Sequence, residues 1–441
     1  MRAFRYLAIL LIPMVGNAQT IWTLEQCIDH VLDNNISIKQ SEIDLQATSV
    51  DKLTAVGAFL PSVSSNMSYN YNQGKNINPV TNQFETTKFQ SASGGVNAGI
   101  NLFSGLANWR QLRLAELSKL SGQYNLNKIK DDIVLMVVNS YLEVISNKEQ
   151  IKALENQLEV TEQNLQRTRD LIDAGALPQG DIYDIEAQLL SQEQQIILTQ
   201  NNLFISKMGL AQLLLLKDYY DFDVADAALE IPITDILSYN PDAIFQKSKE
   251  VIQDLKIAQT NVQIAETNLK LARASYSPRL SAFAGYSTQW SKNYPNDFWS
   301  QFNDNIGFSA GLSLSIPIFN GFSVRGNVTR ARLNLDKSQW ANQQAELTAE
   351  RTVFQAYNDA ANAEKLYTAS EKTAQAKKQA AQYAQDRFEV GLMNSFDFNQ
   401  AKMQQQNAET ESIRAKYQYI FKIKVLEYYF GIQLWDKNEQ K

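Results

Sequence analysis

The longest uninterrupted helical pattern in this sequence restricts the fold more than any other feature. From Gly105 to Gly175 there is no proline, and Gly122 is the only glycine between those two residues. A helix of about 70 residues, rising ~1.5 Å per residue, is roughly 100 Å long. A compact domain has no room for such a rod, so we expect a coiled coil or the wall of a tube.

Residues along this stretch recur every seven positions, and the same spacing continues in the segments that follow. A strict seven-residue repeat makes a helix supercoil against a partner helix. In the second half of the chain the rows contain alanine, which allows two helices to approach closely. The rows are Ile151, Leu158, Leu165 and Ile172; Leu154, Thr161 and Thr168; Ile182, Leu189, Ile196, Leu203 and Leu210; Tyr367, Ala374, Ala381 and Phe388; and Ala401, Ala408 and Ala415.

The two halves of the chain share landmarks at a fixed separation. Phe103 and Gly105 recur as Phe319 and Gly321, 216 positions later. Such a pattern predicts a tandem duplication, with one copy at 19–235 and the other at 236–441. Each copy reads as helix, strand, loop, strand, long helix, turn and long helix. Tyr141 and Tyr357, Gly175 and Gly391, Asp181 and Asp397, and Gln188 and Gln404 share the offset.

Each copy contains two segments in which apolar residues alternate with small or polar ones. This period of two predicts strands with one apolar face. In the first copy the expected strands are 62–71 and 94–103, joined by a polar loop at 72–93. In the second copy they are 280–289 and 306–319, joined by a loop at 290–305. Long helices are expected over about 105–217 and 322–430.

The apolar face of these strands meets either a protein core or lipid. An ordinary soluble sheet is the simpler interpretation, but the opposite face carries Gly, Ser and Asn without Lys or Glu, as in a pore lumen. Aromatic residues at both ends of alternating strands of ~9–11 residues match the girdles of an outer-membrane barrel. They are Tyr69, Tyr71, Tyr286, Trp290, Tyr294, Phe298 and Trp299 at one end, and Phe59, Phe103, Trp109, Tyr276, Phe319 and Phe322 at the other.

Four strands cannot close a barrel. An open sheet edge cannot lie in lipid, because its N–H and C=O groups would lack hydrogen-bond partners. Several chains must therefore share one barrel. Two chains give eight strands, which leaves room only for interior side chains, whereas three give twelve strands and an open lumen. We therefore expect a homotrimer in contact with outer-membrane lipid.

The first 18 residues have the pattern of a secretory signal peptide. Arg2 and Arg5 form a basic start, residues 6–15 are mostly apolar, and small residues lead to a cleavage site after Ala18. No later segment reaches the ~18 uncharged apolar residues that a membrane helix needs. If the mature chain enters a membrane, it does so by strands.

Residue usage argues against an enzyme. His30 is the only histidine and Cys27 the only cysteine, which excludes an internal disulfide, a His-based metal site and a Ser/His/Asp or Cys/His catalytic group. No paired carboxylates stand out, and we predict no catalytic, cofactor-binding or metal-ligating residue. The formal net charge of −6 gives no reason to expect nucleic acid.

In this order, and present twice, these features resemble the TolC-like outer-membrane efflux proteins. The resemblance covers the opening TLEQCIDHVLDNN, the F-x-G turns at Phe103–Gly105 and Phe319–Gly321, and the helix-turn-helix tips AGALPQGDIYDIEAQL (174–189) and VGLMNSFDFNQAKM (390–403). It implies a mainly α fold, in which long coiled-coil hairpins form a periplasmic tunnel below a trimeric twelve-stranded barrel. It also implies an equatorial belt at about 218–235 and after residue 430.

The resemblance further implies a passive outer-membrane duct for efflux or type I secretion. Its partners would be a periplasmic membrane-fusion adaptor and, through it, an inner-membrane RND, ABC or MFS pump. The alternative is a periplasmic coiled-coil scaffold or adaptor that conducts nothing. Conductance in planar bilayers separates the two hypotheses.

Residue by residue, the resemblance points to a gate at the tunnel entrance. Asp181 and Asp397 occupy the positions of entrance aspartates, whereas Gln400 replaces a second acidic residue. Phe388 and Met393 replace a gating tyrosine and arginine, so we expect the closed state to be held differently. Asp397 is expected either to start its helix locally or to form a cation-attracting ring, and both roles remain open.

The tip turns have a structural and a binding interpretation. Gly175 and Gly391 are expected to end the outgoing helices with a positive φ angle. The residues that follow are candidates to dock the adaptor: Ala176, Leu177, Leu392 and Met393.

Overall fold

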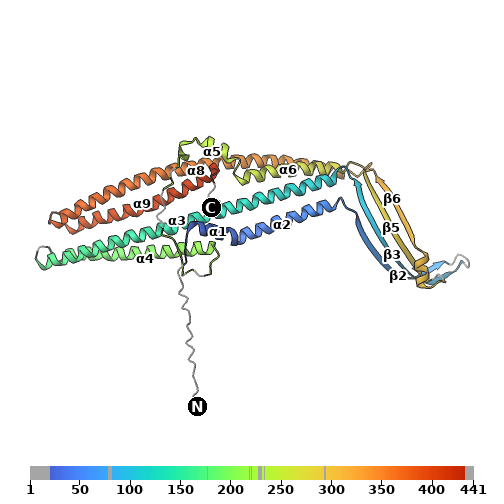
Figure 1. Cartoon of the computed structure of the whole chain (residues 1–441), viewed down its shortest axis with the longest axis horizontal. Helices are drawn as coiled ribbons and strands as arrows, with labels where there is room; N and C mark the ends of the chain where they lie inside the picture. Colours follow the sequence, from blue (N-terminus) through green and yellow to red (C-terminus); the bar gives the residue numbers. More distant parts are fainter. Residues whose placement is uncertain are drawn as a thin grey trace, which may run out of the picture. The chain divides into compact units, whose positions relative to one another are not determined.

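The structure is a computed structural model that describes residues 20–77, 82–175, 177–217, 219, 221–226, 231–232, 234–292 and 295–432 (Figure 1). It separates into two compact units. The first unit holds the described residues of Met1–Lys39, Lys128–Ile252 and Ala349–Lys441, and the second holds those of Gln40–Asn127 and Gln253–Thr348. Each unit takes segments from both predicted copies. The expected signal peptide at 1–18 lies outside the described residues.

Long helices contribute to both units, as the sequence predicts. Helix α3 (Ala107–Asp173) and helix α8 (Ser323–Glu389) each have 67 residues. Each is followed by a turn and a returning helix, α4 (Asp181–Leu213) or α9 (Ser395–Phe430). Among the described helices, none combines the length and the apolar character needed to cross a membrane.

The first unit contains both helical turns and a small sheet. Strands β1 (Thr20–Trp22) and β4 (Phe222–Val224) pair in parallel, and β4 belongs to the expected equatorial segment. Lys148 on α3 holds this sheet, because its Nζ lies 2.8 Å from an Asp223 carboxylate oxygen and donates to the Val224 carbonyl. Helices α1 (Leu24–Asn34) and α5 (Pro241–Ser248) and the short helix η1 (Ile236–Ser238) also lie here.

The predicted seven-residue rows are partly buried in this unit. On α3 the second row is the more deeply buried: Leu154 is 2% exposed, Thr161 3% and Thr168 0%. On α4, Ile196 and Leu210 are buried, and on α8 and α9 the alanines at 381 and 415 are buried. These rows are therefore seams between helices of the same chain.

The second unit contains an antiparallel four-stranded sheet in the order β2-β3-β5-β6, with helices α2 (Ile36–Gly57) and α6 (Gln253–Ala274) contributing. The strands are β2 (Ser62–Ile77), β3 (Phe84–Phe103), β5 (Arg279–Ser291) and β6 (Gly307–Ser315). The expected strand at 306–319 ends early at Ser315, just before Pro317, which has no N–H to donate to a ladder.

The predictions of a loop at 72–93 and of a loop at 290–305 are both wrong in part. Residues 72–77 and 84–93 continue β2 and β3, which pair with each other as far as Ile77 and Phe84. Asn, Gln, Thr and Lys on both faces of this extension hid its strand character in the sequence. The expected loop at 290–305 contains helix α7 (Phe298–Asp304), whose start is capped by Asp297.

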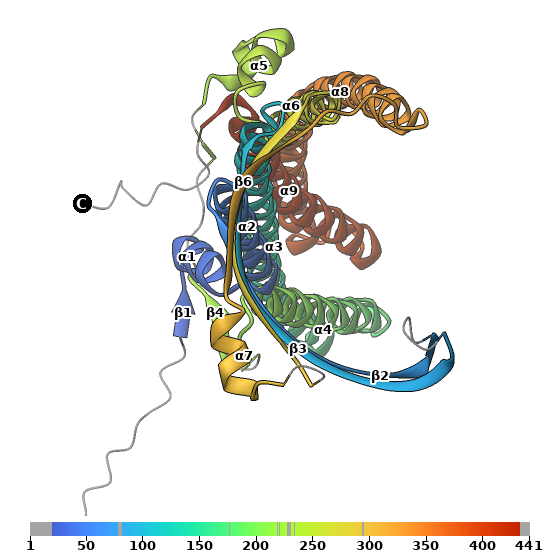
Figure 2. The same cartoon turned by 90° about the vertical axis from the view of Figure 1, so that its right-hand side faces the viewer.

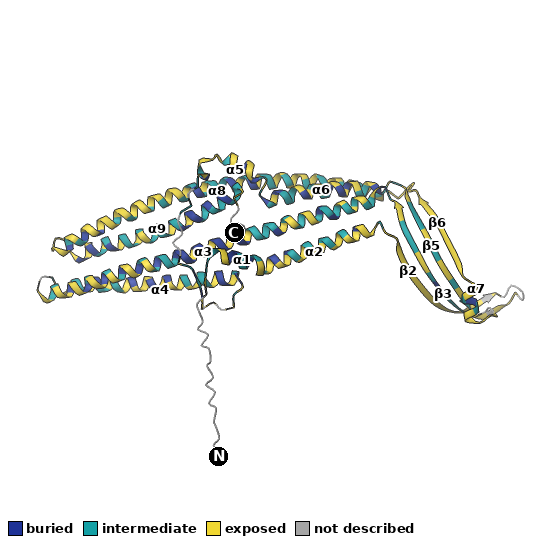
Figure 3. Cartoon of the chain, viewed as in Figure 1, coloured by how far each residue is buried: buried dark blue, intermediate teal, exposed yellow. Residues whose placement is uncertain are grey.

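The sheet has one apolar and one polar face. The register places Val63, Ala98 and Ala284 on the same face, together with Leu312 and Leu314 of β6. The other face is mainly serine, asparagine and glycine, where Asn97 donates to Asn66 (3.2 Å). Much of the sheet is exposed (Figure 3), including Val63 at 68% and Leu312 at 69%.

Candidate functional site

Helices α3 and α8 lead into the two hairpin turns of the first unit. Each of them is closed by a glycine in the left-handed conformation, as expected. Gly175 and Gly391 both have φ +73°. After α8, the Leu392 N–H donates to the Arg387 carbonyl (2.8 Å) and the Gly391 N–H to the Phe388 carbonyl (3.0 Å), which closes the helix end. Leu392 is 68% exposed, whereas Leu177 and Met393 are half-buried. Ala176 lies outside the described residues.

A hydrophobic cluster joins the two hairpins just behind these turns. The rings of Phe388 on α8 and Phe398 on α9 stack with centroids 4.7 Å apart. Leu165 and Ile185 of the α3–α4 hairpin complete the buried cluster with Ala384. Phe388, which the resemblance placed at the gate, is thus a buried contact between hairpins. Met393 packs against the same cluster, together with Leu177, Ile182, Leu189 and Ala401.

Polar contacts also join the hairpins on the side of the turns. The Ser395 hydroxyl, which is 2% exposed, donates to an Asp184 carboxylate oxygen (3.0 Å). Gln192 donates to Gln406 (3.2 Å), and Arg167 lies 3.1 Å from Glu389. We missed Asp184 and Ser395 in the sequence, although both lie within the first turn of their helices. A carboxylate there also offsets the positive helix end.

The predicted aspartates occupy the first turns of α4 and α9. Asn394 and Asp397 bond reciprocally: the Asp397 N–H donates to Asn394 Oδ1 (2.8 Å), and Asn394 Nδ2 donates to Asp397 Oδ2 (3.0 Å). Asp397 therefore takes part in starting its helix, and it is exposed. Asp181 is the first residue of α4 and is half-buried, and Gln400 is exposed.

One lysine is buried within the second hairpin. Lys402 is 6% exposed, and its Nζ donates to Gln385 Oε1 (3.0 Å). Burial lowers the pKa of Lys402, because desolvation disfavours the ammonium form.

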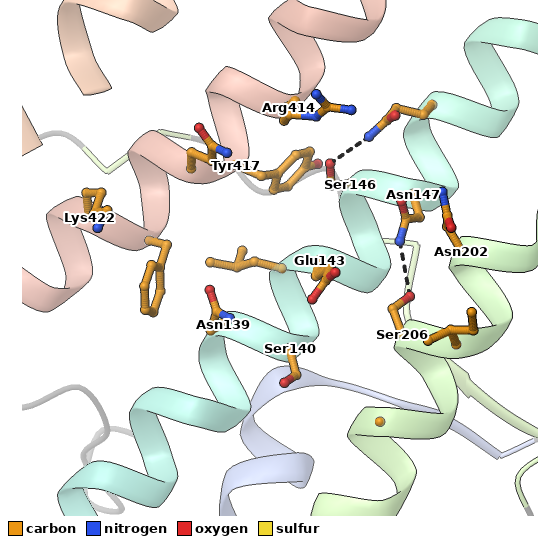
Figure 4. A pocket seen from close by; sticks show the side chains of 16 residues that line it. Asn139, Ser140, Glu143, Ser146, Asn147, Asn202, Ser206, Arg414, Tyr417 and Lys422 are labelled. Carbon is orange, nitrogen blue, oxygen red and sulfur yellow. Dashed lines mark hydrogen bonds between the residues drawn. The ribbon is translucent and has the colours of Figure 1, made fainter. Parts of the chain in front are cut away.

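Farther from the turns, the hairpins are separated by an open polar cavity of about 880 Å³. Figure 4 shows its lining from α3, α4 and α9. Asn147 donates to the Ser206 hydroxyl (3.1 Å) on one side, and Arg414 and Lys422 of α9 lie on the other. Within the described ranges, no His, Cys, Asp and Glu side chains form a group of three or more suited to a metal ion.

The strand-to-helix turns of the second unit have unusual backbone angles. Gly105 and Gly321 have φ +63° and +60°, and the next residues, Leu106 and Phe322, are also positive at 64° and 65°. Gly105 is buried against Ser277, where an added Cβ would lie 2.6 Å from the serine Cβ. Phe103 is 45% exposed, and Phe319 is 76% exposed.

Comparisons with known proteins agree on one family. The sequence profile of the family described as "Outer membrane efflux protein" matches residues 27–214 and 245–424. "Outer membrane protein TolC" of Vibrio cholerae is 22% identical over 380 residues, which cover 85% of this chain and 82% of that protein.

Solved structures share the fold. A membrane protein from Pseudomonas aeruginosa superposes with a TM-score of 0.80 at 18% identity, covering 94% of this chain and 90% of its own. The CmeC outer membrane channel of Campylobacter jejuni gives 0.79 at 18% identity, covering 95% of this chain and 87% of that one.

Proposed function

Because the chain belongs to the outer membrane efflux protein family, we propose that it is a homotrimeric outer-membrane duct that passively conducts substrates out of the cell. A periplasmic adaptor and an inner-membrane RND, ABC or MFS pump would deliver the substrate and supply the energy. The family and the structures that the chain resembles are channels rather than enzymes.

The curvature of the sheet carries this proposal. Phe302 of α7 contacts the apolar face at Gly94, and Figure 2 shows α7 on the convex side of the curved sheet. The apolar face is therefore the convex face. When such sheets join into a barrel, the convex face turns outward to lipid and the concave, polar face lines the lumen. Close packing on the concave face supports this, since a Cβ added at Gly285 would lie 2.8 Å from Asn97 Oδ1.

Open edges and exposed rows support assembly from several copies. Among the described strands, β2 and β6 each have a paired neighbour on one side only. Exposed apolar residues also recur every seven positions on three helices, as expected where a second copy packs. These rows are Ile36, Ile43 and Val50 on α2; Tyr183, Leu190, Ile197 and Phe204 on α4; and Leu333, Trp340 and Leu347 on α8.

We propose that the turn end of the hairpins is the gated entrance. The Phe388–Phe398 stack and the Ser395–Asp184 bond hold the second hairpin against the first. Opening would separate these contacts, whereas the open cavity between α3 and α9 already keeps the two hairpins apart farther from the turns. The exposed Leu392, with Ala176, Leu177 and Met393, remains our candidate to meet the adaptor.

Adjacent substitutions on opposite sheet faces test the duct. Leu312 and Ser313 are neighbours on β6, and both are exposed. Leu312→Lys puts a charge against lipid, which destabilises a barrel by about 2–4 kcal/mol near mid-bilayer. The amount of protein assembled in the outer membrane should therefore fall. Ser313→Lys should assemble normally and shift the selectivity of single channels toward anions. A soluble, non-conducting wild-type protein would instead favour a periplasmic scaffold.

A further inference from the structure

The connection between β5 and β6 folds onto the apolar face of the sheet and leaves the polar face free. A Cβ added at Gly94 of β3 would lie 3.3 Å from the Phe302 ring and 3.7 Å from the Met67 side chain. Thr288 of β5 is the ladder partner of Gly94, and its hydroxyl donates to the Phe302 carbonyl (2.6 Å). Helix α7 therefore cannot act as a lid over the concave, polar face.

Hydrogen bonds fix α7 to the end of β5. Gln301 is 3% exposed, and its side chain accepts from the Ser291 N–H (2.9 Å) and donates to the Ser291 carbonyl (3.0 Å). The same amide donates to the Asn296 carbonyl (2.7 Å), and Asn305 donates to the Gln289 carbonyl (2.9 Å). Because the buried amide is satisfied by the backbone of Ser291 and Asn296, α7 is a built part of this sheet end.

The exposed surface of α7 is aromatic in its first turn and has a carboxylate at each end. Phe298 stacks on Phe302 with centroids 5.2 Å apart, and it contacts Trp290 (5.5 Å) and Trp299 (5.2 Å). Trp299 is 70% exposed. Asp297 and Asp304, both exposed, flank the rings. Aromatic rings with polar groups beside them favour the boundary between acyl chains and headgroups.

The position of α7 on the sheet favours lipid over a neighbouring copy as the surface that covers Phe298 and Trp299. The helix contacts β5 and β3, the two inner strands of the β2-β3-β5-β6 order. A neighbouring copy would pair at β2 or β6, so it would not be centred on the inner strands. The exposed apolar face continues beside α7, at Tyr286 and Phe308.

We propose that α7 is a membrane-interface element, which lies flat on the lipid-facing side of the barrel and sets the depth of its outer end at the headgroup boundary. This inference rests on the proposed outer-membrane function. The occupant is the bilayer itself, contacted through Phe298 and Trp299.

Tryptophan quenching tests the proposal in the assembled full-length protein. The protein is reconstituted in phosphatidylcholine vesicles brominated either near the headgroup or near the chain end, and the Trp299 signal is the difference between wild type and Trp299→Phe. We expect bromines near the headgroup to quench Trp299 severalfold more than bromines near the chain end. Trp340 on α8 is also 70% exposed, and its signal, from Trp340→Phe, should be insensitive to both lipids.

The outcomes separate the two proposals. If the vesicles conduct and Trp299 is quenched by aqueous acrylamide but by neither lipid, α7 faces water and the inference is wrong while the duct stands. Quenching by neither lipid nor acrylamide would place a protein surface over α7 and would also overturn it. If the protein neither inserts nor conducts, the proposed function fails, and the inference fails with it.

Discussion

At the residue scale, Asp397 combines a local bond with an exposed charge. Asp397→Asn keeps a side-chain oxygen for Asn394 but removes the charge, so we expect stability to change by no more than about 0.5 kcal/mol. If three copies ring the entrance, single channels should lose cation preference and multivalent-cation block should weaken. Recordings in planar bilayers measure both.

Asn394→Ala is the matched control for Asp397. This variant keeps the Asp397 carboxylate but removes the cap of α9, which should lower the stability of the fold by about 0.5–2 kcal/mol. Its channels should keep wild-type selectivity. Unchanged selectivity in Asp397→Asn would leave Asp397 with a helix-starting role alone.

The strand-to-helix turns offer a second matched pair. Gly321→Ala should lower the free energy of unfolding by about 1–2 kcal/mol, because alanine is strained at φ +60°. The space around Gly321 is open, so the added methyl group meets no other atom. Gly105→Ala adds a collision, with Ser277 Cβ at 2.6 Å and the Ala274 carbonyl at 2.9 Å. The midpoint of thermal unfolding should therefore fall further for Gly105→Ala. Equal midpoints would show that the Ser277 segment moves aside.

At the element scale, the seven-residue rows correctly located seams between helices. Phe388 belongs to a seven-residue row, which predicts a helix seam, and it is buried in one. By resemblance Phe388 also occupies the position of a gating tyrosine, and its seam lies at the turn end that we propose as the entrance. What local pattern could not reveal was the pairing of β2 and β3 beyond residue 71, where both faces are polar and only the partner strand defines the structure.

Helix α7 was missed for a different reason. Seven residues are too few for a repeat, although Phe298 and Phe302 at i and i+4 and the cap at Asp297 were readable signals. The links between the hairpins through Ser395 and Asp184 join positions 211 residues apart. No local rule predicts such a pairing.

The exposed row on α4 makes an element-scale prediction. Ile197 is 63% exposed in the single chain, and burying it against a second copy would contribute about 1.5–3 kcal/mol per copy. Ile197→Glu should shift native mass from trimer toward monomer without loss of helical circular dichroism. Gln194→Glu adds the same charge at an exposed polar position of α4 and should leave the trimer intact. If both variants form as much trimer as the wild-type protein does, the row on α4 faces water and not a second copy.

At the scale of the whole molecule, closure of the barrel requires β6 of one copy to pair with β2 of the next. Since Cys27 is the only cysteine and is buried, engineered pairs can report this contact in a Cys27→Ala background. We would combine Ser313→Cys with Ser62→Cys, Ser64→Cys or Asn66→Cys, all on the concave face. A disulfide forms when Cα atoms lie about 4.4–6.8 Å apart.

We expect at least one combination to give covalent dimers and trimers on denaturing gels, reversed by reductant. Each single-cysteine variant should remain monomeric on the same gels, because one sulfur per chain cannot link β6 to β2 around a ring. A protein that inserts and conducts, yet gives no cross-link in any combination, would contradict closure through these two edges. In that case another segment would have to satisfy the open N–H and C=O groups of β2 and β6 in lipid.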